Sequence, residues 1–516
     1  MTNGKLLWVD DEIEMLRAQI LFLETKGYQV TKATNGPDAI DLCSEQQFDL
    51  ILLDENMPGL SGLETLQHIK EVQPTVPIVM VTKSEEEDIM NQAIGAKIAD
   101  YLIKPVNPHQ ILLTLKKNIH KQEIVTATTQ DNYRQAFGQI GMQISDSLSW
   151  QDWVEVYKRL VYWELQLSEV GSQMHEMLQM QKQEANNTFA KFIRQNYESW
   201  IEGTSADRPL LSPDIFKKRV FPLLDKGKKV FLLVIDNFRY DQWRAIMGEL
   251  TDLFTIDEEL YYSILPTVTQ YARNAICAGL MPLQIQQMYP HLWTSEEEEE
   301  GKNLNESELI QMQMQRFRRK ETAAYYKLND SEAASRLLGQ FNNLLHNELN
   351  VLVINFIDIL SHAKNEHQLV HELVGNEEAF RSITLSWFRH TAISQLFREI
   401  AHSGYTLLIT TDHGSIQVWN PVRIVGDRQT NTNLRYKVGK NLAYKQKEVI
   451  ELRTPPRVGL PSPNLSSAYV LTAGDRFFAY PNNYNYYVSY YRGSFQHGGI
   501  SMEEMIIPLI KLQPKE

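Results

Sequence analysis

The sequence has little cysteine and no long apolar run, and these two absences exclude several classes of protein. Its two cysteines, Cys43 and Cys277, lie far apart in the chain, so a structural disulfide is not expected and a reducing compartment fits. No window approaches the ~18 uncharged apolar residues of a membrane span. The N-terminus also has no apolar core long enough for a signal peptide. We therefore expect a cytoplasmic protein without a membrane span.

Basic residues are also in deficit. The chain of 516 residues has 51 Lys and Arg against 64 Asp and Glu, for a formal net charge of −13. Sequence-independent binding to duplex DNA needs a basic face, so direct duplex binding is not expected, and the sequence shows no helix-turn-helix. A nucleotide or phosphoester bound through metal ions remains compatible with an acidic chain, because the metals supply the positive charge.

The length suggests about three domains, and the patterns along the chain divide in the same way. Residues 1–122 alternate apolar runs with amphipathic stretches, which predicts a parallel, doubly wound α/β sheet. Residues 123–205 place apolar residues at helical spacing, which predicts a small helical bundle or a long connecting helix pair. Residues 206–516 return to an α/β pattern. Three buried runs of this last segment each end on an aspartate, namely Asp236, Asp358 and Asp412.

Five polar residues of the first segment follow its predicted strands. Asp10 and Asp11 follow the first strand, Asp54 ends the third, Thr82 the fourth and Lys104 the fifth. A carboxylate attacking a dianionic phosphoryl donor meets charge repulsion, which Mg²⁺ held by acidic side chains relieves. A lysine and a hydroxyl can hold the new phosphoryl oxygens. One strand-ending aspartate is often only a helix N-cap, but all five in this order predict a phosphoacceptor site.

The motifs VDDE, LLDENMPGLSGLE and DYLIKP of this segment resemble the response-regulator receiver family. The resemblance implies a flavodoxin-like fold and an aspartyl phosphate at Asp54, with a histidine kinase as partner. It implies one Mg²⁺ held by Asp10, Asp11 and Asp54. It also implies a switch that reshapes the face of the last strand and helix and that involves Thr82, Tyr101 and Lys104.

Seven residues of metal-ligand type stand in the third segment: Asp236, Thr269, Asp358, His362, Asp412, His413 and His497. Such a set can make two adjacent Zn²⁺ sites with mixed nitrogen and oxygen ligands. A dinuclear centre activates a hydroxyl nucleophile and clamps the oxygens of an in-line phosphoryl displacement. Thr269 precedes a predicted helix that Gly279 would close, and a helix N-terminus favours alkoxide and phosphate. Each residue alone also fits an ordinary surface pair, cap or tight turn.

The pieces VIDNFRYDQW, PTVTQYAR, DILSH, TTDHG and HGGISMEEMIIP resemble the PglZ branch of the alkaline phosphatase superfamily. The resemblance implies an alkaline-phosphatase-like α/β domain that holds two Zn²⁺ and uses Thr269 as nucleophile. One metal is implied at Asp236, Thr269, Asp412 and His413, and the other at Asp358, His362 and His497. A threonine nucleophile is similar to that of the phosphodiesterase members, which favours a diester substrate.

Side chains around this predicted centre offer candidate substrate contacts, namely Arg239, Arg273, Asn274, Arg435 and Lys440. Each can equally be an ordinary ion pair. The tyrosines between Tyr484 and Tyr491 would suit base stacking on a nucleotide substrate. Their alternating pattern, however, is more typical of a strand that packs into the sheet.

The order of receiver, helical linker and PglZ-type effector resembles the PorX-type response regulators over nearly the whole chain. The resemblance implies a two-component regulator of type IX secretion whose effector is a phosphodiesterase acting on cyclic or linear oligonucleotides. It also implies a phosphorylation-dependent homodimer, and a sigma factor and secretion components as partners. Two other readings stay open. One is a zinc-stabilised adaptor that works by binding partners, and the other, less compatible with the acidic charge, is a direct transcription regulator.

Overall fold

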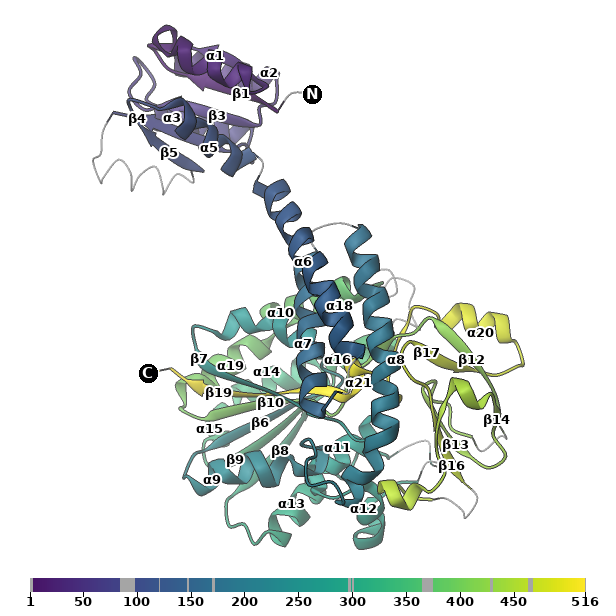
Figure 1. The fold of residues 1–516 in the computed structure, drawn as a ribbon. Coiled ribbons are helices and arrows are strands. Elements are labelled where there is room, and N and C mark those ends of the chain that lie inside the picture. The colour runs from purple at the N-terminus through teal and green to yellow at the C-terminus, as the bar shows by residue number, and fades with distance from the viewer. Residues whose placement is uncertain are drawn as a thin grey trace. The chain divides into compact units, whose positions relative to one another are not determined.

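A computed structural model of the chain forms two compact units, Met1–Asn132 and Tyr133–Glu516 (Figure 1). The structure describes residues 3–83, 98–119, 121–145, 148–168, 172–295, 298, 301–363, 375–426, 430–462 and 467–515. Of residues 121–128, 172–173 and 363 it describes the backbone alone.

The first unit contains a five-stranded parallel sheet of order β2-β1-β3-β4-β5. Its strands are β1 (Gly4–Val9), β2 (Tyr28–Ala33), β3 (Leu50–Asp54), β4 (Ile78–Thr82) and β5 (Asp100–Ile103). The described helices are η1 (Ile13–Leu16), α1 (Arg17–Thr25), α2 (Gly36–Glu45), α3 (Gly62–Val72) and α5 (Pro108–Ile119). Every residue of β3 and β4 is buried, as expected for a sheet with helices on both faces. The predicted flavodoxin-like sheet is confirmed.

The segment after the receiver is helical, as predicted. It forms α6 (Lys121–Ser145), α7 (Trp150–Leu167) and α8 (Ser172–Glu202). Helix α7 begins with a capping box. The Ser149 side chain accepts from the backbone N–H of Asp152, and the Asp152 side chain accepts from the backbone N–H of Ser149. The box thus satisfies two amides that the first turn of a helix leaves unpaired. Residues Trp153, Tyr157 and Leu160 form a buried stripe at helical spacing. This stripe belongs to the same hydrophobic cluster as one face of the effector sheet, and its Trp153 and Tyr157 pack against Phe189 of α8 and Tyr240 of the effector.

The effector sheet has six strands in the order β7-β19-β10-β6-β9-β8. They are β6 (Val230–Ile235), β7 (Phe254–Tyr262), β8 (Ala323–Leu328), β9 (Leu349–Ile354), β10 (Thr406–Thr410) and β19 (Ile506–Pro514). Strands β8, β9, β6 and β10 are parallel, whereas β19 is antiparallel to both of its neighbours. The three runs predicted to end on aspartates are the central neighbours β10, β6 and β9, so their carboxyl ends meet at one edge.

One detail differs from the sequence prediction. Strand β9 ends at Ile354, and Asp358 lies within α16 (Phe356–Ala363) rather than at a strand end. The helix places Asp358 and His362 four residues apart on one face.

Helices cover both faces of this sheet, because alternate residues of β6 enter two separate hydrophobic clusters. The remaining helices of the described residues are α9 (Phe221–Asp225), α10 (Tyr240–Ile246), α11 (Thr269–Ala278), α12 (Pro282–Met288), α13 (Glu306–Arg316), α14 (Ser331–Gly339), α15 (Phe341–Leu344), α18 (Glu377–His390), α19 (Ala392–His402), α20 (Tyr484–Tyr491) and α21 (Met502–Met505). Short turns of helix are η2 (Ser212–Asp214), η3 (Phe216–Val220), η4 (Met247–Leu250), η5 (Pro290–Leu292), η6 (Gln446–Glu448) and η7 (Pro455–Val458). Helix α11 ends at Gly279, whose φ of 60° is left-handed, as predicted for that glycine.

The described residues also form small sheets outside the main one. Strands β11 (Ile416–Gln417) and β18 (Phe495–Gln496) pair with each other. A second sheet has the order β14-β12-β17, with strands Ala443–Tyr444, Asn420–Val425 and Arg476–Ala479. A third has the order β13-β16-β15, with strands Tyr436–Gly439, Ala468–Leu471 and Ile450–Leu452. Figure 1 shows β12, β13, β14, β16 and β17 together, on the other side of α8 from the main sheet in that view.

The prediction of a strand in the tyrosine-rich run is wrong, because residues Tyr484–Tyr491 form helix α20. Val488 and Tyr491, three residues apart, pack against the cluster around Phe477. Tyr486 and Tyr490, four residues apart, are exposed by 65% and 42% and stack on each other. The spacing of these contacts is helical, and the alternation in the sequence was a misleading signal.

The described residues bear on two expectations, that the chain has no membrane span and no structural disulfide. None of the described helices has the length and apolarity needed to cross a membrane. Cys43 and Cys277 are both free and buried.

Candidate functional site

The first candidate site lies at the carboxyl ends of β1, β3 and β5 in the receiver. Carboxylate oxygens of Asp10, Asp11 and Asp54 lie within 4.8 Å of one another. Lys104 Nζ lies 2.7 Å from Asp10 Oδ2 and 2.8 Å from Asp54 Oδ2. Burial raises the pKa of Asp54, although its hydrogen bond with Lys104 acts in the opposite direction. This acidic triad fits a Mg²⁺ site, since Mg²⁺ prefers carboxylate oxygens.

The predicted switch residues lie on the two strands beyond Asp54. Thr82 ends β4 and is buried. Tyr101 is half-buried in β5, where it pairs with Met80 of β4. Their roles in switching remain predictions.

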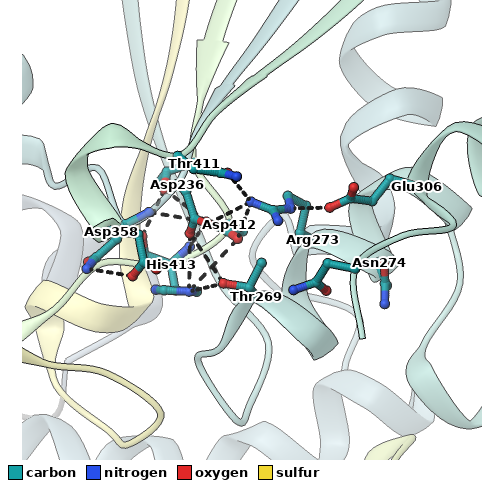
Figure 2. Close-up of polar contacts among 12 residues, drawn as sticks. Asp236, Thr269, Arg273, Asn274, Glu306, Asp358, Thr411, Asp412 and His413 are labelled. Atoms are coloured by element: carbon teal, nitrogen blue, oxygen red, sulfur yellow. Dashed lines mark hydrogen bonds and ion pairs between the residues drawn. The ribbon is translucent and has the colours of Figure 1, made fainter. Parts of the chain in front are cut away.

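The second candidate site lies in the effector, where the seven predicted ligands come from five segments of the chain. Figure 2 shows Asp236, Thr269, Asp358, Asp412 and His413 among them. Ligand atoms of Asp236, Asp412 and His413 lie within 4.8 Å of one another, and those of Asp358, His362 and His497 form a second such group. Asp236 and the pair Asp412–His413 follow the neighbouring strands β6 and β10. His497 directly follows β18. The structure therefore brings together residues that are separated by up to 261 positions in the sequence.

Thr269 is the first residue of α11 and faces the first group. Its Oγ1 lies 3.3 Å from Asp236 Oδ1 and 3.1 Å from His413 Nε2. His413 Nε2 also lies 3.7 Å from Asp236 Oδ1 and 3.9 Å from Asp412 Oδ2. The hydroxyl thus points at the ligand atoms from a helix N-terminus, where free N–H groups favour negative charge.

The second group converges on one carboxylate oxygen. Asp358 Oδ1 lies 3.4 Å from His362 Nε2 and 3.5 Å from His497 Nε2. The imidazoles of His413 and His497 stack with ring centroids 4.2 Å apart. This stacking joins the two groups into one centre with two adjacent sets of ligands.

Backbone carbonyls fix which nitrogen of two histidines faces the centre. His413 Nδ1 lies 3.2 Å from Gly414 O, and His497 Nδ1 lies 3.2 Å from Thr267 O. A carbonyl can only accept, so each Nδ1 carries the hydrogen and each Nε2 presents a lone pair. Metal-ligating histidines are commonly oriented by such a contact.

The pKa shifts of the ligand residues indicate that this centre lacks the positive charge needed to balance its buried carboxylates. Burial raises the pKa of Asp236 to about 8, and the nearby Asp412 carboxylate adds to the increase. Burial also raises the pKa of Asp412 and lowers the pKa of both His413 and His497. Among the described residues, Asp412 Oδ2 is buried without a hydrogen-bond partner. A metal ion would supply the missing charge and use these atoms as ligands, so the residues present fit one.

Asp358 behaves differently from the other two carboxylates. Burial would raise its pKa, but the hydrogen bond with the half-exposed His362, and the charge of that imidazole when it is protonated, outweigh burial and lower it. Asp358 is therefore the member of the centre most readily ionised.

The candidate substrate contacts divide into internal and accessible groups. Arg239 is buried and ion-paired with Asp241 and Glu377, and Arg435 is buried 2.5 Å from Glu504. These pairs argue against phosphate contacts, because each guanidinium already has a carboxylate partner. Lys440 is exposed after β13.

Arg273 and Asn274 both lie on α11 beside Thr269 (Figure 2). Arg273 is buried between Asp236 and Glu306, at 2.7 Å and 2.6 Å. Asn274 donates to Lys302 O, at 3.1 Å, while its buried Oδ1 has no hydrogen-bond partner among the described residues. Arg273 thus holds Asp236 in place, and a substrate role for Asn274 remains a prediction.

Sequence reasoning missed Asn237, which links the two groups. Its backbone N–H donates to Asp412 Oδ1 at 3.4 Å, and its side chain donates to Asp358 Oδ1 at 3.3 Å. It takes a positive φ of 59°, a conformation that asparagine tolerates better than most residues. An asparagine directly after a strand-ending aspartate was the signal that could have found it.

Three family matches cover most of the chain. Residues 6–116 match the "Response regulator receiver domain", residues 123–201 the "PorX response regulator linker domain", and residues 215–512 the "BREX system PglZ alkaline phosphatase-like domain". Fold and matches together define the class as a response regulator with a phosphatase-like effector. The last match spans more than half of the sequence. The chain belongs to the PglZ family and, with its receiver and linker, is a PorX-type response regulator.

Several curated response regulators match about a quarter of this chain. The transcriptional regulatory protein ResD of Bacillus subtilis is 40% identical over 112 residues, which are 22% of this chain and 46% of ResD. ZraR of Klebsiella oxytoca is 32% identical over 26% of this chain and 31% of its own length. The chain thus spans less than half of the length of these relatives. Among solved structures, chemotaxis protein CheY4 of Vibrio cholerae is 29% identical over 22% of this chain and 98% of its own, with a TM-score of 0.22.

Proposed function

We propose that this response regulator is a phosphodiesterase whose effector is governed by phosphorylation of Asp54. One observation carries the proposal: the Thr269 hydroxyl, at the start of α11, contacts Asp236 and His413 of the first of two adjacent groups of metal-ligand side chains. We assign the receiver to residues 1–122, the linker to 123–205 and the effector to 206–516. The effector's family supports a phosphoesterase, and the threonine nucleophile favours a diester, with cyclic or linear oligonucleotides as the substrate class.

In the proposed reaction, Thr269 Oγ1 attacks phosphorus and one alcohol of the diester leaves with the proton that the hydroxyl loses. The intermediate is a threonine phosphodiester that keeps the second alcohol, and water then hydrolyses its bond to Thr269 to release a phosphomonoester. Two Zn²⁺ held by the two groups would lower the pKa of the hydroxyl and clamp the phosphoryl oxygens. The N–H groups at the start of α11 stabilise negative charge on the attacking oxygen and on the phosphate. Arg273 fixes Asp236 beside the hydroxyl through their 2.7 Å contact.

A Thr269→Val variant tests this assignment, with Thr269→Ser as its matched control. Valine keeps the shape but lacks the hydroxyl, so cleavage of a model diester such as bis(p-nitrophenyl) phosphate should fall by about 100-fold or more. Serine keeps a nucleophile and should retain measurable cleavage. Parent-level hydrolysis by the valine variant, at unchanged metal content, would remove Thr269 from the mechanism.

The kinase, the oligomeric state and the partners of this regulator are also part of the proposal. A receiver implies a cognate histidine kinase. We further propose a phosphorylation-dependent homodimer that acts in type IX secretion, with a sigma factor and secretion components as partners. Pull-down with a phosphorylated parent and an Asp54→Asn variant would show whether any such contact depends on phosphorylation.

A second candidate function, a zinc-stabilised adaptor, is favoured by the exposed tyrosine face of α20. Tyr486, Tyr487 and Tyr490 are exposed by 65%, 39% and 42%, and exposed tyrosines are typical of binding surfaces. Loss of hydrolysis in Thr269→Val with unchanged signalling in cells would favour the adaptor over the enzyme.

A further inference from the structure

Linker helix α8 contacts two of the effector segments that carry the site. The Tyr197 hydroxyl accepts from Leu265 N at 2.8 Å, four residues before Thr269. Asn186 accepts from Met502 N at 2.8 Å and donates to Glu503 Oε2 at 2.9 Å, five and six residues after His497. Asn186 and Glu503 are both buried, so water does not compete for these contacts.

A buried ion-pair network reinforces the contact between α8 and α21. Lys182 Nζ of α8 lies 2.8 Å from Glu164 Oε2 of α7 and 3.4 Å from Glu503 Oε1 of α21. Glu164 also pairs with Arg381 of α18, at 3.0 Å. Because desolvated charges need their partners, these helices are held in one arrangement.

Helix α21 in turn fixes the backbone beside both site histidines. A Cβ on Gly414 would lie 2.1 Å from Glu503 O, so only glycine allows this approach. Gly414 N also donates to Glu504 O at 3.1 Å, and Gly414 O receives the hydrogen of His413 Nδ1. On the other side, Gly499 N donates to Glu504 Oε1 at 2.8 Å, two residues after His497.

We infer that Asn186 and Lys182 of the linker are positioning residues for His413 and His497. They hold Glu503 and therefore α21, whose backbone and side chains set the two loops that carry the imidazoles. The linker is thus a built-in part of the effector site, and any displacement of α8 changes the geometry around Thr269. The expected effect on kcat rests on the proposed function of that site. The expected effect on the loops that carry the histidines does not.

A purely structural role for α8 predicts a different pattern, and the chain offers a matched control. Gln181 is a second buried amide of α8, but it contacts α6 through Phe137 O at 2.9 Å and Tyr133 at 3.4 Å. Both Asn186→Ala and Gln181→Ala remove a buried amide from the same helix. Only Asn186→Ala releases α21.

The test compares these two full-length variants with the parent by hydrogen–deuterium exchange and by hydrolysis of bis(p-nitrophenyl) phosphate. Asn186→Ala should speed exchange in peptides around Gly414 and Gly499 and lower kcat by about tenfold or more with KM within about twofold. Gln181→Ala should leave the exchange of these peptides and kcat unchanged, even if its melting temperature falls as much as that of Asn186→Ala.

Two results would overturn the inference. One is unchanged exchange around Gly414 and Gly499 in Asn186→Ala, and the other is an equal effect of Gln181→Ala on those peptides and on kcat. If the parent itself cleaves no diester while the exchange pattern appears as expected, the proposed function fails and the positioning contact stands.

Discussion

Arg273 Nη1 lies 2.7 Å from Asp236 Oδ2 with both side chains buried. The same guanidinium lies 2.6 Å from Glu306, so one cation holds two carboxylates in the interior (Figure 2). Its position is set by α11, the helix that also begins with Thr269. Helix α11 therefore positions both Thr269, the proposed nucleophile, and Arg273, which holds the neighbouring ligand Asp236.

Removing Arg273 should destabilise the effector. In an Arg273→Met variant, Glu306 and Asp236 lose their shared cation, and breaking such a buried pair costs about 3–5 kcal/mol. Lys440→Met, at an exposed position, should change stability by less than about 0.5 kcal/mol. Urea unfolding of metal-free protein measures both, and equal free energies of unfolding would contradict the role given to Arg273.

The stability of metal-free protein should fall as pH rises from about 7 to 8. Folding raises the pKa of Asp236 to about 8, so its contribution is full below the unfolded value of about 4 and is lost as pH rises through 8. Burial keeps the pKa of His413 and His497 below the ordinary histidine value, so both imidazoles are neutral in the folded centre in this range and do not mask this loss. For one proton the loss approaches about 1 kcal/mol per pH unit.

The measurement is the melting temperature of EDTA-treated protein across this range. An Asp236→Asn variant should show a flatter dependence than the parent. Metal should oppose the loss in the parent, since ligands give up protons on binding. A parent curve that rises with pH, or a variant curve as steep as that of the parent, would contradict the assignment.

Gly414 should not tolerate alanine. The added Cβ would lie 2.1 Å from Glu503 O, so the loop after His413 must shift or α21 must move. We expect Gly414→Ala to lower zinc content, measured by atomic emission, and to lower the melting temperature. Gly248→Ala is the control, because its Cβ would meet nothing within 4 Å. Full zinc content in Gly414→Ala would show that the backbone approach is not needed for the site.

Phosphorylation of the receiver should require Asp54 and should not require Asp41. Asp54→Asn lacks the nucleophilic carboxylate, so incorporation of phosphate from acetyl phosphate with Mg²⁺ should be lost. Asp41→Asn, at an exposed position of α2, should be phosphorylated like the parent. Phosphate-affinity electrophoresis reads out both variants. Labelling of Asp54→Asn at the parent level would place the phosphoacceptor elsewhere.

The sequence predicted those parts of the molecule that follow from local patterning. Apolar runs between helical stretches predicted the receiver sheet, since a strand buried on both faces must be apolar throughout. Strand-ending aspartates predicted that Asp236 and Asp412 would meet, because carboxyl ends of parallel strands share one edge. Residue type and position singled out all seven candidate ligands, and the resemblance to PglZ proteins divided them between two sites. The convergence of segments as far apart as Asp236 and His497 is not visible from spacing in the sequence.

The rest depended on tertiary contacts. Arg239 and Arg435 looked like phosphate contacts. Besides the nearby Asp241, Arg239 pairs with Glu377, and Arg435 pairs with Glu504. These two glutamates lie more than sixty residues from their partners in the chain. The tyrosines of α20 alternate like a strand, yet the face with Val488 packs at helical spacing. The contact between Asn186 and Glu503 spans 317 positions, and neither residue carries a motif.

The central claim is that phosphorylation of Asp54 controls diester hydrolysis at Thr269. Its most direct test is the rate of hydrolysis of a model diester by full-length protein with and without acetyl phosphate and Mg²⁺, in the parent, Asp54→Asn and Thr269→Val. The account predicts a rate that changes on phosphorylation in the parent, does not respond in Asp54→Asn, and is lost in Thr269→Val. A parent rate that is the same in both conditions, at confirmed phosphorylation, would contradict the claim.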